Sequence, residues 1–377
     1  FTRWVHTHTV EPDGPAACVL EDRVEYVPPL GALGGIFGSN YVRRRLETAF
    51  AFRQLVTAQD VVAHNRWSPK PLRILVTGAT GLVGGALLPY LTAGGHSVAR
   101  LARPGTHSAT PPGLPVEVIE WDPAAGDAAP AGALEGFDAV VHLAGENISE
   151  GRWTAAKKKR IRESRVRGTA GLAAGLAGLA RPPRVFVAAS AIGYYGDRGD
   201  ENLVEASPRG RGFLAEVCEE WEAATAPAVA AGIRTVNLRT GVVLSPEGGA
   251  LGKMLLPFRM GAGGEIGDGR QWVSWVVLDD LLDVILHAIA DPALSGPVNA
   301  VAPHPVTNEE WTNALGRVLS RPTLLPMPGF AARAAFGEMA DELLLSSTRV
   351  IPERLLAARH AYRFLEVEPA LRYLLGR

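Results

Sequence analysis

Three glycines spaced three residues apart, Gly78, Gly81 and Gly84, constrain the fold of this chain more than any other feature. The apolar run 72–76 precedes them and predicts a short buried strand, and a helical pattern of leucines follows. In such a turn the first glycine lets the chain reverse, the second lets backbone amides approach a pyrophosphate, and the third lets the helix pack on the strand. The pattern predicts dinucleotide binding, with a plain strand-to-helix turn as the alternative.

The strand predicted over 96–102 bears on the choice of dinucleotide. An NAD site normally has an acid at the end of this strand, where it binds the ribose hydroxyls. Here the strand ends in Arg100-Leu-Ala-Arg103 without an acid, and Arg103 lies about 20 residues beyond the glycines. A guanidinium at this place suits the 2′-phosphate of NADP through paired, charged hydrogen bonds. NADP is therefore the predicted cofactor, and a solvated arginine at a strand end is the alternative interpretation.

The composition limits the class of protein. The 377 residues allow about two or three domains, and a formal net charge of −1 does not point to nucleic acid as a partner. Cys18 and Cys218 are the only cysteines and lie far apart, which argues against a disulfide framework and favours a reducing, cytoplasmic compartment. No apolar run reaches membrane-spanning length, and no signal peptide opens the chain. Because the sequence begins at Phe1, inside a predicted strand, we expect a fragment of a longer protein.

Residues 1–27 alternate between two faces on either side of Asp13-Gly14, a pattern that predicts a β-hairpin. His6 and His8 fall on one face, as two metal ligands would. No third ligand is evident nearby in the sequence, so both are interpreted as ordinary strand residues. After a proline- and glycine-rich loop, the spacing of apolar residues predicts a long helix over 41–64.

A hairpin and one helix cannot close a core by themselves, so this segment needs a partner. It resembles the carboxyl-terminal end of a START-like polyketide cyclase/dehydrase domain, in which a curved sheet grips a long terminal helix. The resemblance is carried by Trp4-Val-His-Thr-His8, Asp22-Arg-Val-Glu-Tyr26, Pro29-Leu-Gly31 and Arg45-Leu-Glu-Thr-Ala-Phe50. Residues 68–71, Ser-Pro-Lys-Pro, predict a linker because two prolines prevent a helix or a strand from running through.

Beyond the second strand the chain keeps alternating strands and helices, which predicts an α/β fold with a Rossmann-type, doubly wound parallel sheet. Further strands are predicted over 116–121, 138–143, 184–189 and 233–238, and a helix over 210–231. In open α/β sheets the ligand lies at the carboxyl ends of the strands. A basic helix follows the fourth strand and carries Lys157, Lys158, Lys159, Arg160, Arg162, Arg165 and Arg167. It is interpreted mainly as a solvated face, of which one or two residues could reach a phosphate.

These positions give the candidate cofactor-binding residues, which lie in the glycine turn, at the strand ends and on the basic helix. They are Gly78, Thr80, Gly81, Leu82, Val83, Gly84, Arg103, Leu143, Ala144, Gly145, Asn147, Arg165, Arg239 and Val243.

From about residue 72 to 377 the chain resembles an extended short-chain dehydrogenase/reductase of the epimerase-like branch labelled a SulA homologue. Beyond the glycine turn, the resemblance runs through Leu143-Ala-Gly-Glu-Asn-Ile148, Gly193-Tyr-Tyr195, Arg239-Thr-Gly-Val-Val-Leu244, Met254-Leu-Leu-Pro-Phe258 and Val301-Ala-Pro303. It implies NADP, a fold like that of nucleoside-diphosphate-sugar epimerases and a helical carboxyl-terminal cap. It implies little about the substrate.

The chain departs from this family where the chemistry is expected. Extended reductases normally use a Tyr-x-x-x-Lys pair, in which the tyrosine transfers the proton and the lysine lowers its pKa. The corresponding helix here has Phe213 and Val217, which can do neither. The family also has a serine or threonine at the preceding strand end, and by our interpretation Ala191 holds that position, with Ser190 just before it.

Other protic groups could take over the proton transfer. Tyr194 and Tyr195, together with Ser190, are the candidate catalytic residues because they lie at a strand end beside the expected nicotinamide. Cys218 and Glu219 follow on the next helix. Each also has a structural interpretation: a packed tyrosine with its hydroxyl satisfied, a buried cysteine, a solvated glutamate.

Two functions from different classes remain open. One is an NADP-dependent oxidoreductase or epimerase with a non-standard proton donor, acting on a small or hydrophobic molecule. The other is a non-catalytic NADP-binding protein that regulates a partner. The sequence also allows a homo-oligomer. The predicted domains are a START-like fragment over 1–67, an NADP-binding domain over 72–250, and a substrate lobe with a helical cap over 251–377, interleaved with elements of the sheet.

Overall fold

The structure, a computed structural model, describes residues 1–15, 17–28, 31–67, 70–105, 116–123 and 128–377. The chain divides into two units, Phe1–Ala58 and Gln59–Leu375. Helix α1 (Gly31–Trp67) begins in the first unit and ends in the second. Ser68 and Pro69 of the predicted linker lie outside the described residues. Among the helices that the structure describes, none combines the length and the apolar character needed to span a membrane.

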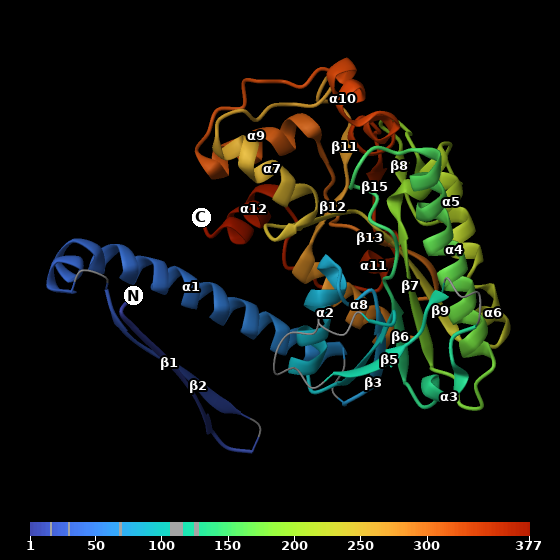
Figure 1. Ribbon diagram of the computed structural model, residues 1–377, viewed down its shortest axis with the longest axis horizontal. Coiled ribbons are helices and arrows are strands. Elements are labelled where there is room, and N and C mark those ends of the chain that lie inside the picture. Colours follow the sequence, from blue (N-terminus) through green and yellow to red (C-terminus); the bar gives the residue numbers. More distant parts are fainter. Residues whose placement is uncertain (16, 29–30, 68–69, 106–115, 124–127) are drawn as a thin grey trace. The chain divides into compact units, whose positions relative to one another are not determined.

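A parallel sheet of seven strands forms the centre of the second unit (Figure 1). In spatial order its strands are β13 (Gly296–Ala300), β9 (Arg234–Thr240), β7 (Val185–Ala191), β6 (Ala139–His142), β3 (Arg73–Thr77), β4 (Ser97–Ala102) and β5 (Glu117–Glu120). The chain runs outward from β3 through β4 to β5 and then crosses to β6, so the strand order reverses between β3 and β6. Such a switch point is where this class of fold binds ligands. The predicted doubly wound α/β fold is confirmed.

Helices cover both faces of this sheet, as Figure 1 shows. Along β3, Ile74 and Val76 face one layer and Leu75 faces the other, and all three are fully buried. Each such aliphatic side chain contributes about 1.5–3 kcal/mol on burial. The first layer consists of α2 (Leu82–Ala93), α8 (Leu278–Ala290) and α11 (Glu353–Ala357), and the second of α3 (Ala131–Leu134), α4 (Ala155–Ala177) and α6 (Ala226–Ala230). The near-continuous apolar strands are thus explained by burial on both sides.

A second core lies in the carboxyl-terminal lobe, around Phe258, Trp275 and Trp311. Its helices are α7 (Gly249–Arg259), α9 (Asn308–Leu319) and α12 (Val367–Leu375), and the lobe also carries α10 (Gly329–Phe336) and the π-helical turn η4 (Ala340–Leu344). Three short strand pairs join it to the sheet region: β10 (Val242–Ser245) with β12 (Trp275–Val277), β11 (Trp272–Val273) with β14 (Val306–Thr307), and β8 (Asn202–Leu203) with β15 (Arg349–Val350). The structure has a capping box at Thr307 and Glu310, which together satisfy two amides at the start of α9.

Three elements of the second unit differ from the sequence prediction. The helix expected over 210–231 is two helices, α5 (Phe213–Ala223) and α6, and Pro227 lies in the first turn of α6, where its missing amide costs least. The strand expected to end at residue 189 continues through Ala191, which places Ser190 inside β7. The sequence analysis also gave no separate strand for β13, whose Pro297 is tolerated because β13 lies at the edge of the sheet.

The first unit contains the predicted hairpin, formed by β1 (Arg3–Pro12) and β2 (Cys18–Val27). Helix α1 begins at Gly31, ten residues before its predicted start at residue 41. The glycines of this segment reduce helix propensity by about 1 kcal/mol each without forbidding a helix, which is why composition alone suggested a loop.

The interpretation of His6 and His8 requires a correction. His8 is paired directly with Asp22 across the hairpin, and Asp22 Oδ1 lies 3.1 Å from His6 Nε2 and 2.5 Å from His8 Nδ1. The expectation that no third ligand lies nearby is therefore wrong. The strand register brings Asp22 to the face that carries both histidines, although it is distant along the chain.

Candidate functional site

The glycine turn between β3 and α2 has the close contacts that its spacing predicts. Gly78 has a φ of +71°, and a Cβ there would lie 2.6 Å from the carbonyl carbon of Leu143 at the end of β6. A Cβ on Gly84 would lie 2.3 Å from the carbonyl oxygen of Gly78. Gly81 differs, because its Cβ would meet that oxygen at 3.4 Å, close to ordinary contact. Gly78 and Gly84 are therefore required by the turn itself, whereas Gly81 leaves space open in front of the amino terminus of α2.

A cavity of about 290 Å³ opens in front of this turn, at the carboxyl ends of β3, β4 and β6. Seven of the predicted cofactor residues line it: Gly78, Thr80, Gly81, Arg103, Leu143, Ala144 and Gly145. Because these residues come from three separate strand ends, the fold has brought together positions that are up to 67 residues apart in the sequence.

Arg100 also lines this cavity, and the sequence analysis did not include it among the candidates. It is fully buried in β4, three residues before Arg103, which is exposed. Two guanidinium groups therefore converge where the second strand ends. The signal was present in the Arg100-Leu-Ala-Arg103 segment, but a buried arginine inside a strand cannot be distinguished by sequence from a solvated one.

Buried hydrogen bonds hold the end of β6 against β3. Thr77 Oγ1 lies 2.7 Å from His142 Nδ1, and His142 Nε2 lies 3.1 Å from Thr169 Oγ1 on α4. Thr77 Oγ1 also accepts from the amides of Leu143 and Ala144. Burial lowers the pKa of His142 to about 4, so the imidazole is neutral and serves as a rigid connector. These bonds fix the turn that forms one wall of the cavity.

The other predicted cofactor residues do not line this cavity. Leu82, Val83 and Gly84 belong to the first turn of α2 and pack toward the sheet, and Val243 packs against the same core. Asn147 interacts with Ser149 and Glu150 in its own loop.

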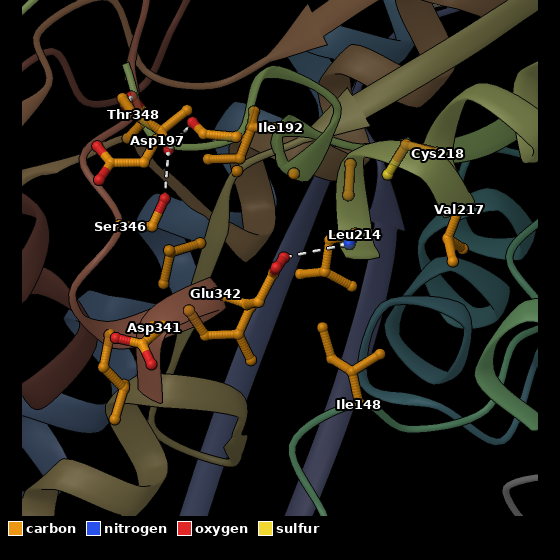
Figure 2. Close-up of a pocket in the computed structure, with 18 of the residues that line it drawn as sticks. Ile148, Ile192, Asp197, Leu214, Val217, Cys218, Asp341, Glu342, Ser346 and Thr348 are labelled. Atoms are coloured by element: carbon orange, nitrogen blue, oxygen red, sulfur yellow. Dashed lines mark hydrogen bonds between the residues drawn. The ribbon is translucent and has the colours of Figure 1, made fainter. Parts of the chain in front are cut away.

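A larger cavity, of about 530 Å³, lies where the end of β7 and helix α5 face the carboxyl-terminal lobe. The short turn η3 (Ile192–Tyr195), which follows β7, forms part of its wall. Figure 2 shows apolar side chains such as Ile148, Leu214 and Val217 around it, with Asp197, Cys218 and Glu342 among the polar ones. Arg165 of α4 lines it too, and its Nη1 donates to the carbonyl oxygens of Glu146 and Ile161. The cavity is therefore mainly apolar with a few charged groups, as small-molecule sites usually are.

One of the two positions of the expected Tyr-x-x-x-Lys pair, Val217, lines this larger cavity, and Ala191, at the expected serine position, does so as well. Phe213 turns its ring toward Trp153, with ring centroids 5.5 Å apart. Cys218 also lines the cavity, but burial, followed by the charge of Glu222, raises the pKa of its thiol to about 12. The thiol is therefore neutral near pH 7 and is a poor proton donor or nucleophile.

Glu342 was not expected to contribute to this site. Its carboxylate, from η4 in the carboxyl-terminal lobe, accepts hydrogen bonds from the amides of Phe213 at 3.0 Å and Leu214 at 3.1 Å, the second of which is drawn in Figure 2. Gly212 has a φ of +110°, and a Cβ there would lie 2.5 Å from Glu342 Oε1. Nothing in the local sequence around residue 342 indicates this contact, because it spans more than a hundred residues.

Tyr195 and Ser190 belong to a buried polar network beside this cavity, and none of the three candidate catalytic residues lines it. Tyr195 donates to Asn299 Oδ1 at 2.7 Å and accepts from Arg239 Nη1 at 3.0 Å. Ser190 Oγ donates to Glu222 at 2.7 Å, and Glu222 also holds Arg239 through two hydrogen bonds. Burial raises the pKa of Tyr195 to about 12, although Arg239 opposes the shift.

These contacts give Tyr195 and Ser190 structural roles and account for Arg239. Burial opposes the charge of Arg239, yet Glu222 keeps the pKa of this guanidinium above its ordinary range. Tyr194 is different, because its ring lies against the guanidinium of Arg239, with the carbon Cζ 3.5 Å from the ring centroid, and it is only half-buried. The assignment of a proton donor among these residues stays a prediction.

Comparison with known protein families gives two matches. Residues 74–301 match the model of the NAD dependent epimerase/dehydratase family, and residues 327–374 match a domain of unknown function (DUF1731). An epimerase family protein of Mycobacterium tuberculosis is 44% identical to this chain over 302 residues, which cover 80% of this chain and 96% of that protein.

Solved structures agree with these matches. A nucleoside-diphosphate sugar epimerase from Corynebacterium glutamicum is 35% identical, covers 99% of this chain and 71% of its own, and superposes with a TM-score of 0.76. The human epimerase family protein SDR39U1, solved with NADPH, is 36% identical, covers 80% of this chain and 99% of its own, and has a TM-score of 0.72.

Proposed function

The chain belongs to the NAD dependent epimerase/dehydratase family, and from this premise we propose that it binds NADP(H) in the cavity in front of the glycine turn. The convergence of the turn, the end of β6 and two arginines on one cavity carries this proposal. The start of α2 offers unpaired amides and a positive helix end to the pyrophosphate. Arg103, with Arg100 beside it, would bind the 2′-phosphate. The human relative solved with NADPH supports this choice.

We propose that the larger cavity takes a small molecule and that the protein is an oxidoreductase or epimerase of the extended short-chain type. When bound, the cofactor supplies hydride transfer. The described residues would orient and desolvate the substrate, through the apolar wall that includes Leu214, Val217 and Trp272. Of the three candidate proton donors, Tyr195 and Ser190 have hydroxyls that are already engaged, which leaves Tyr194, although it lies beside this cavity and not in its wall.

The second candidate function is a non-catalytic NADP(H)-binding protein that regulates a partner. The residues at the positions of the missing Tyr-x-x-x-Lys pair favour it. Phe213 and Val217 provide neither a proton nor a cation, and the carboxylate of Glu342 occupies the amino terminus of the same helix. Steady turnover of NADPH with any added carbonyl substrate would favour the enzyme. Tight NADPH binding without turnover would favour the regulatory protein.

For residues 1–67 we propose the carboxyl-terminal part of a START-like domain, with the NADP-binding domain over 72–250 and the lobe over 251–377. Two observations support this proposal: the hairpin followed by a long helix, and the C. glutamicum structure, whose match extends over 99% of this chain. A protease that cuts first within residues 68–71 would agree with these limits, whereas first cleavage inside 72–250 would argue against them.

Substitution of a glycine that the fold can spare tests the cofactor proposal. Gly81→Ala adds a methyl group that the turn tolerates, since the new Cβ has its nearest contact at 3.4 Å, but this group enters the cavity. NADPH affinity should fall by about tenfold or more, the loss of roughly one hydrogen-bonded contact. Gly85→Ala is the matched control, because Gly85 does not line the cavity and its Cβ would meet only the carbonyl oxygen of Ala79, at 3.6 Å. Equal NADPH affinity in both variants and the unmodified protein, measured by calorimetry, would refute the proposal.

A further inference from the structure

The hairpin of the first unit presents two imidazoles and a carboxylate on one face. His6 and His8 alternate along β1, so both side chains project to the same side of the hairpin. Asp22 lies opposite His8 in the register of β2, which places its carboxylate on that side as well. This arrangement follows from the backbone pairing and does not depend on any one rotamer.

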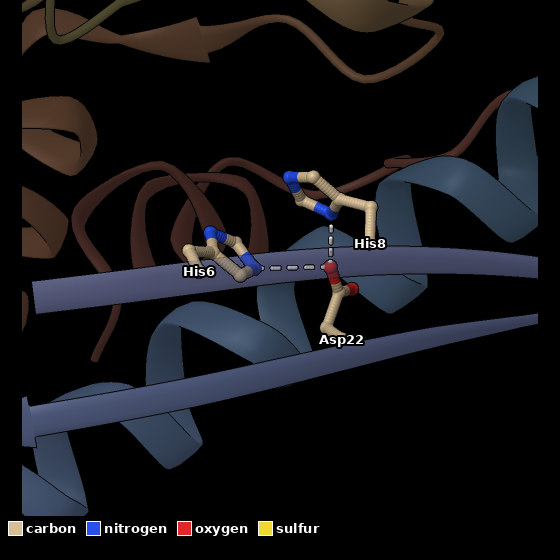
Figure 3. A group of neighbouring side chains, drawn as sticks. All are labelled: His6, His8 and Asp22. Atoms are coloured by element: carbon tan, nitrogen blue, oxygen red, sulfur yellow. Dashed lines mark hydrogen bonds and ion pairs between the residues drawn. The ribbon is translucent and has the colours of Figure 1, made fainter.

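The side chains converge on a single point, as Figure 3 shows. The nearest ligand atoms of the three residues all lie within 4.8 Å of one another, and both rings direct a nitrogen at Asp22 Oδ1. In a tetrahedral zinc site, bonds of about 2.0–2.2 Å place neighbouring ligand atoms roughly 3.3 Å apart. The separations of the two imidazole nitrogens from Asp22 Oδ1, 3.1 and 2.5 Å, need only a small expansion to accept an ion, and the ligand atoms of the two histidines lie within 4.8 Å of one another. Phe50 lies beside the cluster, with its ring centroid 5.5 Å from that of His6.

A positive charge already lies at this point. Arg53 of α1 donates from Nη1 to Asp22 Oδ1 at 2.7 Å, and both of its terminal nitrogens lie 3.4 Å from His8 Nδ1. The carboxylate of Asp22 thus already pairs with a cation. The Arg53 side chain is 38% exposed and can swing into solvent.

We propose that His6, His8 and Asp22 form a binding site for a divalent transition metal, with Zn²⁺ as the best match to two imidazoles and one carboxylate. Mg²⁺ and Ca²⁺ do not suit this ligand set, because both ions bind mainly to oxygen atoms and two of the three ligands here are imidazole nitrogens. Three protein ligands leave at least one coordination position for water or an anionic ligand, and His8 is half exposed to solvent on that side. Arg53 competes with the metal and leaves when it binds.

The test is a calorimetric titration of the full chain, stripped of metal, with Zn²⁺. We expect one Zn²⁺ per chain, and an affinity lowered on the order of 10- to 100-fold or more in each of His6→Ala, His8→Ala and Asp22→Asn. His304→Ala is the matched control, since it removes an exposed histidine that also pairs with a carboxylate, Glu366, and it should change nothing. Circular dichroism of each variant confirms that it is folded.

Arg53→Gln tests the proposal through a gain of Zn²⁺ affinity instead of a loss. Removing the competing guanidinium should raise Zn²⁺ affinity by about tenfold. Co²⁺, used as a coloured substitute, should show visible absorption bands that disappear in His8→Ala. The proposal is overturned if neither the unmodified chain nor Arg53→Gln binds Zn²⁺ at micromolar concentrations. It is equally overturned if the His6→Ala/His8→Ala double variant binds Zn²⁺ as the unmodified chain does, because the metal would then be held elsewhere.

Discussion

The carboxylate of Glu342 accepts a hydrogen bond from the backbone amide of Phe213, at a distance of 3.0 Å. This contact joins the carboxyl-terminal lobe to the helix that carries the altered catalytic positions. Helix α5 begins after Gly212, which has no side chain to cap it, so a residue from another part of the chain supplies the cap. The lobe and the Rossmann part are therefore coupled at the larger cavity.

Replacing Glu342 by Ala should destabilise the protein by about 0.5–2 kcal/mol, the usual cost of losing an N-cap. Asp341→Ala is the matched control, because Asp341 forms an exposed ion pair with Arg333 that is worth at most about 1 kcal/mol. Urea denaturation of both variants measures the two free energies of unfolding. If Glu342→Ala were no less stable than Asp341→Ala, the cap would have no energetic role.

The two neighbouring tyrosines should respond differently to loss of the hydroxyl. Tyr195→Phe leaves Asn299 Oδ1 and Arg239 Nη1 without this buried partner, which should cost about 1–3 kcal/mol. Tyr194→Phe keeps the ring against Arg239 and should change stability by less than about 0.5 kcal/mol. Thermal unfolding of the two single variants gives the comparison, and equal losses would show that the network is described wrongly.

Catalytic activity should be low with ordinary substrates. Without a tyrosine–lysine pair, proton transfer loses a contribution of about 10²–10⁴ in rate. We therefore expect negligible oxidation of bound NADPH with simple aldehydes, ketones or sugar nucleotides. The absorbance of NADPH measures this oxidation. Should turnover appear with some substrate, Tyr194→Phe is the variant expected to abolish it while NADPH affinity is kept. Rapid reduction of ordinary carbonyls by the unmodified protein would contradict this expectation.

Stability should depend on pH through Asp280, a buried carboxyl at the start of α8. Burial raises its pKa to about 7, and the charge of Asp283 adds to the shift, although amide hydrogen bonds from Arg363 and Phe364 oppose it. In the unfolded chain an aspartate has a pKa of about 3.9. Between this pKa and the higher pKa of the folded state, the folded protein holds a proton that the unfolded chain has lost. The stabilisation is complete below about pH 4 and is lost as the pH rises to about 7.

Asp280→Asn removes this titration. The difference in unfolding free energy between the unmodified protein and Asp280→Asn should therefore favour the unmodified protein more at pH 5 than at pH 8. Asp268→Asn, at an exposed position, should show no such change between the two pH values. A difference for Asp280→Asn that is independent of pH would mean that its carboxyl titrates normally in the folded state.

The sequence predicted most of the sheet because each buried strand is a short apolar run with turn residues on either side. The glycine turn could be predicted from the glycine spacing together with the strand before it and the helix after it, since Gly78 and Gly84 are dictated by backbone contacts within a few residues or with the end of β6. The edge strand β13 was not given separately, because the proline in it resembles a loop signal when the edge position is unknown.

The contacts that define the two cavities could not be predicted in the same way. Glu222, Glu342 and, in the hairpin, Asp22 acquire their roles from partners 14 to 129 residues away, through packing of elements or strand register. A periodicity argument detects which face of an element is buried but does not identify the polar side chain that another element brings to that face. For this reason the tyrosines at the end of β7 resembled catalytic residues in sequence, while the structure shows Tyr195 in a closed hydrogen-bond network.

The central claim, that this chain selects NADP(H) through the arginines at the end of β4, is tested most directly by calorimetric titration of Arg103→Ala with NADPH and with NADH. We expect the unmodified protein to bind NADPH more tightly than NADH. In Arg103→Ala, NADPH should bind about tenfold or more weakly, as the loss of a charge-assisted contact worth about 1.5–3 kcal/mol requires, while NADH should be almost unaffected. Arg167→Ala, on α4 and paired with Glu163, is the control and should leave both affinities unchanged. Equal affinities for NADPH and NADH in the unmodified protein, or an equal loss of both in Arg103→Ala, would contradict the account.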